Sequence, residues 1–376
     1  MIRFNEAPYI GKEFSYIEKA IRSGKLSGGG EFTDLCQKWL QEKCGDSAGV
    51  LLTTSCTHAM ELAAMLVDIK EGDEIIMPSF TFVSTATAFV QRGARIVFVD
   101  IRPDTLNINE TRIESAITNR TKTIVPMHYA GVGCEMDEIS TIASAYKIAV
   151  IEDAAQGVMA KYKGKGLGSI GDFGCFSFHD TKNFTMGEGG AIVIKDAALY
   201  EKAEIFREKG TDRSKFFRGM VDKYTWVDKG SSYIPSELNA AYLYPQLLEA
   251  DLIIKDRMAS WELYHSLLSP LAEQGIIKLP DIPEYCAHNA HMFYIRTKSF
   301  KERASLISFL GDRDITAVFH YIPLHTSPAG KKYGRFNGTD EFTTYESERV
   351  LRLPLFYGLS AENVRYIADS IIEFYS

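Results

Sequence analysis

Residues 173–194 read FGCFSFHDTKNFTMGEGGAIVI, and this stretch holds a single lysine between two apolar runs. The run from Phe173 to Phe178 predicts a buried strand, and Ala191 to Ile194 predicts a second strand after the glycines. Lys182 lies in the polar turn between them, where desolvation at the mouth of a sheet lowers the pKa of an ammonium group. A neutral amine can form a Schiff base with a carbonyl cofactor. Taken alone, however, Lys182 is better explained as a solvated turn residue.

Upstream of this stretch, short apolar strands alternate with helical segments. The expected strands are 50–52, 74–77, 95–99, 123–127 and 148–151, and the expected helices are 57–67, 85–91, 108–117 and 136–146. Strands that are apolar throughout and alternate with helices predict a mainly parallel sheet covered on both faces, which is an α/β fold. Ligands bind such sheets at the carboxyl ends of the strands.

The chain is long enough for a second domain. Helices are predicted at 236–248 and 253–271, followed by strand candidates at 291–296 and 317–321 and a final helix at 361–374. We therefore expect a large domain at residues 1–250, which includes an N-terminal arm, and a smaller C-terminal domain at residues 251–376.

The composition narrows the class of protein. A net charge of −7 over 376 residues argues against a general nucleic-acid binder. No uninterrupted apolar run approaches membrane-spanning length, and the N-terminus lacks an apolar signal core. The six cysteines are scattered without a Cys-x-x-Cys pair, as is typical of thiols in a reducing compartment. We expect a cytoplasmic protein that binds neither membrane nor nucleic acid.

Two further motifs fall at expected strand ends. The turn TTSCT at residues 53–57 would present backbone amides and hydroxyls to a phosphate, although capping by Ser55 or Thr57 explains it equally simply. Asp153 stands at the carboxyl end of the strand expected at 148–151, where a buried carboxylate needs a partner or a ligand. The order of phosphate turn, Asp153, Ser177 and Lys182 favours a phosphorylated pyridine aldehyde bound as a lysine Schiff base, with the carboxylate at the ring nitrogen.

These motifs identify a resemblance. The chain resembles the DegT/DnrJ/EryC1/StrS sugar aminotransferases, and the similarity extends over essentially its whole length, in SGKLSGG (23–29), PSFTFVST (78–85), IEDAAQ (151–156), FSFHDTKN (176–183) and HYIPLH (320–325). The resemblance implies the fold-type I aminotransferase architecture. In it, a large domain with a mainly parallel seven-stranded sheet is joined to a smaller α/β C-terminal domain.

The resemblance also implies roles for individual residues. Lys182 would carry pyridoxal 5'-phosphate, Asp153 would pair with the ring nitrogen, and Gln156 would bond the ring hydroxyl. Phe82 would stack on the ring. The remaining implied contacts, all to the phosphate, are Cys56, Thr57 and Ser177.

The chain departs from the family pattern at the residue expected to reach the neighbouring subunit's phosphate. The family usually has Gly-Tyr-Asn-Tyr-Arg-Met, whereas residues 230–235 read GSSYIP, so Ser232 takes the asparagine position in an expected homodimer. Cys56 stands where glycine is commoner, which leaves a backbone contact open to it. The residues expected on the substrate side are Lys25, His320, Tyr321 and His325, and core packing explains these aromatic residues almost as well.

The motifs HDTKN (179–183) and GSSY (230–233) are most similar to those of family members that make dTDP-4-amino-4,6-dideoxygalactose for enterobacterial common antigen, a lipopolysaccharide-related pathway. The resemblance thus implies transfer of an amino group from L-glutamate to dTDP-4-keto-6-deoxy-D-glucose, with Lys182 as general base and pyridoxamine 5'-phosphate as the intermediate cofactor form. A gluco product, a 3-keto substrate and a non-catalytic binding or regulatory protein remain alternatives. Lys182 argues against the family's 3-dehydratases, which carry histidine at this position.

Overall fold

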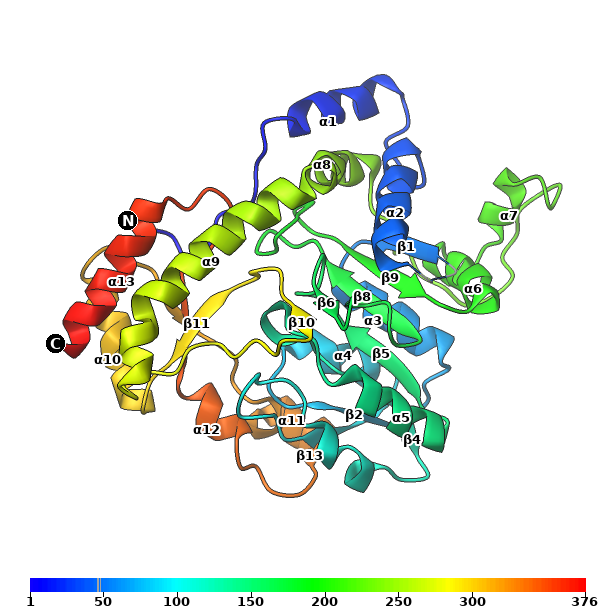
Figure 1. The fold of residues 1–376 in the computed structure, drawn as a ribbon. Coiled ribbons are helices and arrows are strands. Elements are labelled where there is room, and N and C mark those ends of the chain that lie inside the picture. The colour runs from blue at the N-terminus through cyan, green and yellow to red at the C-terminus, as the bar shows by residue number, and fades with distance from the viewer. Residues whose placement is uncertain (46, 48) are drawn as a thin grey trace.

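The computed structural model describes residues 1–45, 47 and 49–376. The largest sheet within these residues has eight strands in the order β1-β9-β8-β5-β4-β2-β3-β13 (Figure 1). Their bounds are β1 Gly49–Thr53, β2 Glu74–Pro78, β3 Arg95–Val99, β4 Thr121–Ile124, β5 Ala149–Asp153, β8 Phe173–Ser177, β9 Gly190–Ile194 and β13 Gly334–Phe336.

The sheet is mainly parallel, as the sequence predicts, but it gains one strand. β9 runs antiparallel to both of its neighbours, β1 and β8, whereas the other pairs are parallel. Seven of the eight strands of this sheet precede residue 195, and β13 joins them from the C-terminal part of the chain by pairing with β3. β13 has three residues, of which one is exposed and two are half-buried. It therefore carries too little apolar pattern to be recognised in the sequence.

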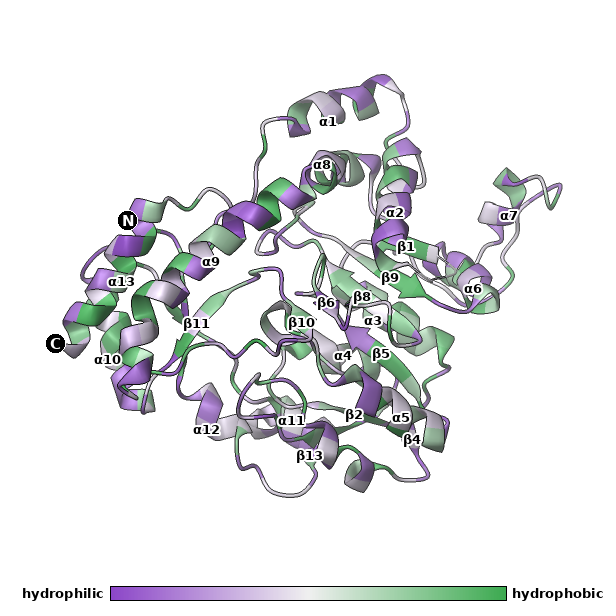
Figure 2. Cartoon of the chain, in the orientation of Figure 1, coloured by the Kyte–Doolittle hydropathy of each residue, from purple (hydrophilic) through white to green (hydrophobic). Residues whose placement is uncertain are grey.

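Helices cover both faces of this sheet because its strands carry apolar side chains on both sides. In β1, Leu51 packs with α3 and α4, whereas Val50 and Leu52 pack on the opposite face with α2 and α8. The helices of this part of the chain are α1 Glu13–Arg22, α2 Glu31–Cys44, α3 Cys56–Leu66, α4 Val83–Val90, α5 Met136–Tyr146, α6 Ala197–Arg207, α7 Arg213–Phe217 and α8 Glu237–Leu248. Figure 2 shows β8 and β9 in hydrophobic green, while α1 carries much hydrophilic purple.

The C-terminal part builds its own core. The long helix α9 (Ala250–Glu273) and α13 (Ala361–Tyr375) pack together over a sheet in the order β11-β14-β12. The division after residue 250 stays a prediction, and α9 begins at that residue. The other elements of this part are β10 Cys286–Ala287, β11 Phe293–Arg296, α10 Phe300–Gly311, β12 Val318–Phe319, α11 Pro328–Tyr333, α12 Thr343–Ser347 and β14 Val350–Leu353, with β10 pairing to the hairpin of β6 Lys161–Tyr162 and β7 Lys165–Gly166.

Most of the predicted elements form, but the helix predicted at 108–117 is wrong. Two short 3-10 helices, Glu110–Arg112 and Glu114–Ala116, occupy that stretch instead. Asn107 donates its side-chain amide to the carbonyls of Val132 and Gly133, and the Asn109 side chain accepts from the amide of Thr111. Such side-chain bonds to the backbone compete with the regular helical ladder.

Two further features are the state of the cysteines and the hydropathy of the helices. All six cysteines, which lie in the described part of the chain, are free thiols, and five of them are buried. No helix among residues 1–45, 47 and 49–376 is long and apolar enough to span a membrane.

Candidate active site

A cavity of about 940 Å³ lies at the carboxyl ends of β5 and β8, where an α/β sheet is expected to bind its ligand. Residues from both parts of the chain line it. Nine of the twelve predicted site residues line this cavity, which we call the Lys182 pocket: Cys56, Thr57, Phe82, Asp153, Gln156, Ser177, Lys182, His320 and Tyr321.

Lys182 occupies the polar turn after β8, as the sequence predicts. Its backbone amide donates to the carbonyl of His179 (3.0 Å), and the next residue, Asn183, ties the turn to the C-terminal part through the carbonyl of Asn289 (2.8 Å). Burial lowers the pKa of the Lys182 ammonium, although the nearby Cys56 and Asp153 oppose the shift. The pocket therefore favours the neutral, nucleophilic amine more than water does.

Asp153 is the last residue of β5, and its side chain is only 3% exposed. Its Oδ2 accepts a hydrogen bond from the hydroxyl of Thr85 (2.6 Å), and its Oδ1 accepts from the amide of Ala155 (3.1 Å). These two donors orient the carboxylate at the pocket wall and leave it acceptor capacity, since a carboxylate can take about four hydrogen bonds. The arrangement suits a carboxylate that receives a proton-bearing ring nitrogen.

The start of α3 forms the polar end of the pocket. Ser55 is the N-cap, with its hydroxyl accepting from the amide of His58 (3.0 Å), so the capping interpretation is correct for this residue. Cys56, Thr57 and Ser177 line the pocket beyond it. The Cys56 thiol points to the carbonyl of Cys175 (3.6 Å), which leaves its backbone as the group available to a ligand.

Gly190 lets the start of α3 pack closely against the sheet. It pairs with Thr53 in β1 and with Ser177 in β8, and a Cβ at this position would meet the amide nitrogen of Cys56 at 2.4 Å. Any other residue would therefore displace the first turn of α3. The glycine preserves a cradle of backbone amide and hydroxyl groups next to a helix N-terminus, which suits a phosphate.

Aromatic side chains form the opposite wall. Phe82 is 55% exposed, and its ring centroid lies 6.2 Å from that of Tyr321. Gln156 is buried: its Oε1 accepts from the amide of Ala130 (2.6 Å), and its Nε2 donates to the hydroxyl of Tyr321 (3.2 Å). A pocket with an aromatic ring on one wall, an amine, a buried carboxylate and an anion cradle suits the polarity of a phosphorylated pyridine aldehyde.

Among the residues predicted on the substrate side, His320 and Tyr321 line the pocket and His325 does not. The His320 Nδ1 lies 3.0 Å from the hydroxyl of Tyr129, and burial lowers the pKa of its ring. His325 instead contacts the hydroxyl of Ser79 (2.7 Å) and the carboxylate of Asp340 (3.1 Å). These contacts hold His325 between the sheet and the C-terminal part of the chain.

Lys25 and Ser232 also lie outside the pocket. Lys25 is in the loop between α1 and α2, with its amide bonded to the hydroxyl of Ser23 (3.2 Å). Ser232 is exposed and forms a β-bridge with Glu208. The resemblance assigns the Ser232 position to a neighbouring subunit's site, and that assignment stays a prediction.

Sequence reasoning assigned no role to several residues that the structure brings to the pocket. Thr85 supports the carboxylate of Asp153. It lies inside the motif PSFTFVST, but nothing in the sequence distinguishes it from the other residues of that motif. Phe4 comes from the N-terminal arm, and Arg352 comes from β14. Arg352 had a detectable signal, because it is a charged residue inside the apolar strand Val-Leu-Arg-Leu.

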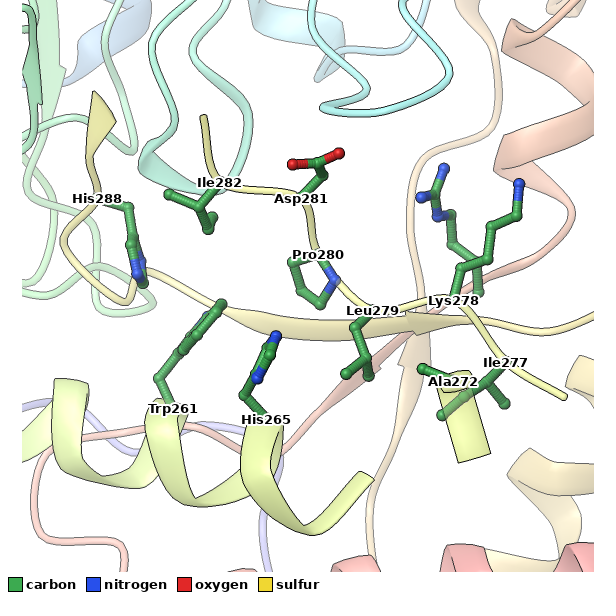
Figure 3. Close-up of a pocket in the computed structure, with 11 residues that line it drawn as sticks. Trp261, His265, Ala272, Ile277, Lys278, Leu279, Pro280, Asp281, Ile282 and His288 are labelled. Atoms are coloured by element: carbon green, nitrogen blue, oxygen red, sulfur yellow. The ribbon is translucent and has the colours of Figure 1, made fainter. Parts of the chain in front are cut away.

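A second cavity, of about 600 Å³, lies in the C-terminal part between α9, β11 and residues 277–282. Figure 3 shows Trp261 and His265 rising from α9 toward Pro280 and His288. The ring of Trp261 stacks on that of His265, with centroids 5.3 Å apart. We call this cavity the Trp261 crevice. None of the predicted site residues lines it.

Neither cavity has the ligand set of a metal site. Among the described residues, no group of three or more histidine, cysteine, aspartate or glutamate side chains is arranged to hold a metal ion.

Comparison with known proteins agrees with this geometry. The model of the DegT/DnrJ/EryC1/StrS aminotransferase family matches residues 9–372. GDP-perosamine synthase of Escherichia coli O157:H7 is 32% identical over 371 residues, covering 97% of this chain and 96% of that protein. A pleiotropic regulatory protein of Geobacillus stearothermophilus is 33% identical over 321 residues, covering 85% and 83%.

Solved structures share the fold across the whole chain. A candidate sugar aminotransferase of Streptococcus pneumoniae superimposes in its PMP form with a TM-score of 0.89 at 26% identity, covering 100% of this chain and 99% of that one. Its PLP form gives a TM-score of 0.88 at 26% identity, covering 99% and 98%. The family match, the two relatives and the shared fold lead to one conclusion: this chain belongs to the DegT/DnrJ/EryC1/StrS aminotransferase family.

Proposed function

We propose that the chain is a pyridoxal-phosphate-dependent aminotransferase that makes dTDP-4-amino-4,6-dideoxy-D-galactose from dTDP-4-keto-6-deoxy-D-glucose, with L-glutamate as amino donor. The observation that carries the proposal is the pairing, in one pocket, of an amine whose pKa is lowered by burial with the buried carboxylate of Asp153. The name of the perosamine synthase relative supports an activated sugar as the substrate.

The side chains divide the work as follows. Pyridoxal phosphate, when bound, supplies an electron-accepting ring and a carbonyl carbon. Asp153, held by Thr85, would keep a proton on the ring nitrogen. Lys182 would be the amine that binds the cofactor and the base that moves a proton at the substrate carbon. Phe82 and Tyr321 would shield the ring from water, while Thr57 and Ser177 would hold the phosphate.

Two alternatives rest on particular observations. The name of the perosamine synthase relative favours a GDP-linked sugar over a dTDP-linked one. The regulatory name of the Geobacillus relative favours a non-catalytic role. The presence of Lys182 and Asp153 at one pocket argues for catalysis, and a gluco product or a 3-keto substrate fits the same residues.

We also propose that two copies form a cytoplasmic homodimer in which Ser232 reaches the neighbouring site. Ser232 is exposed and is held in a β-bridge to Glu208, so it is accessible to a second chain. Light scattering should give twice the chain mass, and a Ser232→Ala variant should bind the cofactor more weakly while remaining a dimer. A monomer with full cofactor affinity would refute this assembly.

The test of the function is an assay with L-glutamate and each candidate sugar, namely the dTDP-linked 4-keto-6-deoxyglucose and a GDP-linked 4-keto sugar. We expect 2-oxoglutarate to form with the dTDP sugar, and NMR coupling constants should show the galacto configuration at carbon 4. Turnover with the GDP sugar alone would replace the proposed substrate. A protein that takes up no pyridoxal phosphate and gives no product would support the regulatory alternative.

A further inference from the structure

We propose that Arg352, positioned by Phe4 of the N-terminal arm, binds a carboxylate of the amino donor. This inference rests on the proposed aminotransferase function and names the donor-binding residue of that site. The N-terminal arm is residues 1–5, which the sequence interpretation left without a role.

The first observation is the unusual position of Arg352. It lies in the middle of β14, between the buried Leu351 and Leu353, and its side chain enters the Lys182 pocket. Among the residues that line this pocket, Arg352 and Lys182 are the two whose side chains are cationic at all ordinary pH values in water. The proposed function assigns Lys182 to the cofactor, so Arg352 is the cation that remains available to bind a substrate.

The second observation is that the guanidinium is incompletely paired. Its Nη2 donates to the carbonyl of Phe319 at 3.4 Å, and its Nε is buried without a hydrogen-bond partner among the described residues. No carboxylate in the described part of the chain forms a salt bridge with it. Arg352 is half-buried, and a guanidinium carries five donors and binds carboxylates in a fork, so open donors at a pocket wall point to an anionic ligand.

The third observation concerns the reacting centre. Arg352 lines the same pocket as Lys182, His320 and His291, and its charge contributes to lowering the pKa of each of them. The carboxylate of an amino acid is bonded directly to the carbon that carries the amine, so it must lie close to the Lys182 nitrogen during transfer. The diphosphate of a nucleotide sugar is separated from the reacting carbon 4 by the sugar ring, which places it farther toward the pocket mouth.

The N-terminal arm holds this guanidinium in place. The Arg352 guanidinium carbon lies 4.6 Å from the centroid of the Phe4 ring, in a cation–π contact. Two links fix the arm on either side: Ile2 forms a parallel bridge with Ile315, and the Asn5 side chain donates to the carbonyl of Asp180 (3.3 Å). Because Asp180 stands two residues before Lys182, the arm connects the donor-binding cation to the turn that carries the catalytic amine.

The test measures binding and reaction separately. Glutarate carries the two carboxylates of the donor without its amine, so calorimetric titration of the cofactor-loaded protein reports anion binding without turnover. Arg352→Met should weaken glutarate binding by about 10- to 100-fold, because a charge-assisted pair is lost. The matched control is Arg365→Met on the exposed side of α13, which should bind like the unaltered protein.

The kinetic arm follows the absorbance change when L-glutamate alone reacts with the loaded protein. Arg352→Met should raise the glutamate concentration at half-maximal rate by a similar factor and leave the affinity for the dTDP sugar within about twofold. Phe4→Ala should give a loss of a few-fold, and Phe4→Trp, which keeps the cation–π contact, should restore the affinity.

The outcomes separate this inference from the proposed function. Normal glutarate binding by Arg352→Met, in a protein that still transfers amino groups, would overturn the inference and leave the function intact. Loss of dTDP binding rather than glutarate binding would assign the guanidinium to the diphosphate and also overturn it. If the unaltered protein binds glutarate through Arg352 but transfers no amino group to any sugar, the proposed function fails while the anion site stands.

Discussion

The Lys182 pocket and the Trp261 crevice contain similar side chains and differ in how they hold them. Each has a lysine, an aspartate, histidines and aromatic rings on its walls. In the crevice, Lys278 and Asp281 are exposed and the rings pack on one another. In the pocket, Asp153 is buried at the end of a strand, and burial shifts the pKa of Lys182. Residue composition alone therefore does not identify a reactive site, because the protein must also remove water from opposed charged groups.

Glu152 and Asp153, two neighbouring acids at the end of β5, differ in the same way. Glu152 is fully buried and saturated: it accepts from the backbone amides of Gly168, Ile170 and Gly171, and His128 Nε2 lies 2.8 Å from its Oε2. Asp153, one residue later, points to the other face and accepts two hydrogen bonds from described residues. The saturated acid holds a loop in place, whereas the acid with remaining capacity faces the pocket.

The largest effect that separates the two cavities is expected from their lysines. Lys182→Ala should abolish transfer, with a loss of at least about 10³-fold, because both the nucleophile and the base disappear. Lys278→Ala should leave the rate unchanged, since that side chain is exposed on the crevice rim. Borohydride reduction of the cofactor-loaded protein should fix the cofactor permanently to its lysine as a label. Peptide mass analysis should then find this label on Lys182. Label on Lys278, or normal turnover by Lys182→Ala, would invert the comparison.

The next effect sharpens the contrast between the two acids. Asp153→Asn should lower the transfer rate by about 10²-fold with little change in melting temperature, because the amide cannot hold a charged ring nitrogen as a carboxylate does. Glu152→Gln should instead lower the free energy of unfolding by about 2–4 kcal/mol, since it weakens several charge-assisted bonds to buried amides. Rate assays and thermal melts on both variants test this. A large rate loss without destabilisation in Glu152→Gln would contradict it.

The sequence alone predicts those parts of the site that depend on local patterns of residues. Continuous apolar runs predict the strands, and strand ends place Asp153, Ser177 and Lys182 at one edge, because the geometry of a parallel sheet requires it. The aminotransferase family is confirmed by the match over residues 9–372. His325 was expected beside the substrate on motif grounds, yet the structure ties it to Asp340 outside the pocket.

What the sequence could not provide is contact between distant segments. Arg352 and Phe4 are separated by almost the whole chain, and they meet because the C-terminal part and the N-terminal arm fold against the same pocket. The same reason hides Thr85, whose bond to Asp153 crosses from α4 to the end of β5. Periodicity describes neighbours along one element, and it carries no information on which elements will touch.

A smaller effect is expected from the residue that orients Asp153. Thr85→Val removes the 2.6 Å hydrogen bond and preserves the shape of the side chain, so we expect a rate loss of about 5- to 10-fold. Thr87→Val is the matched control, because Thr87 is exposed on the same helix. Equal losses in both threonine variants would point to a general effect on α4.

The smallest effect on activity is expected in the crevice, where titration should change stability instead. Burial lowers the pKa of His288 to about 4, whereas in the unfolded chain this histidine titrates near its ordinary pKa of 6.5. The unfolded state therefore binds more protons between these values, so the free energy of unfolding should fall as the pH drops from 6.5 toward 4. At pH 5 the loss is about 1–2 kcal/mol relative to pH 7.

His288→Asn should flatten this dependence in urea titrations, with Trp261 fluorescence as the probe, because the Trp261 and His288 ring centroids lie 4.5 Å apart. Transfer rates should stay unchanged, since a crevice that lacks the buried amine and carboxylate pair contributes to the fold and not to the reaction. An unaltered pH dependence in His288→Asn would show that other groups carry the acid sensitivity.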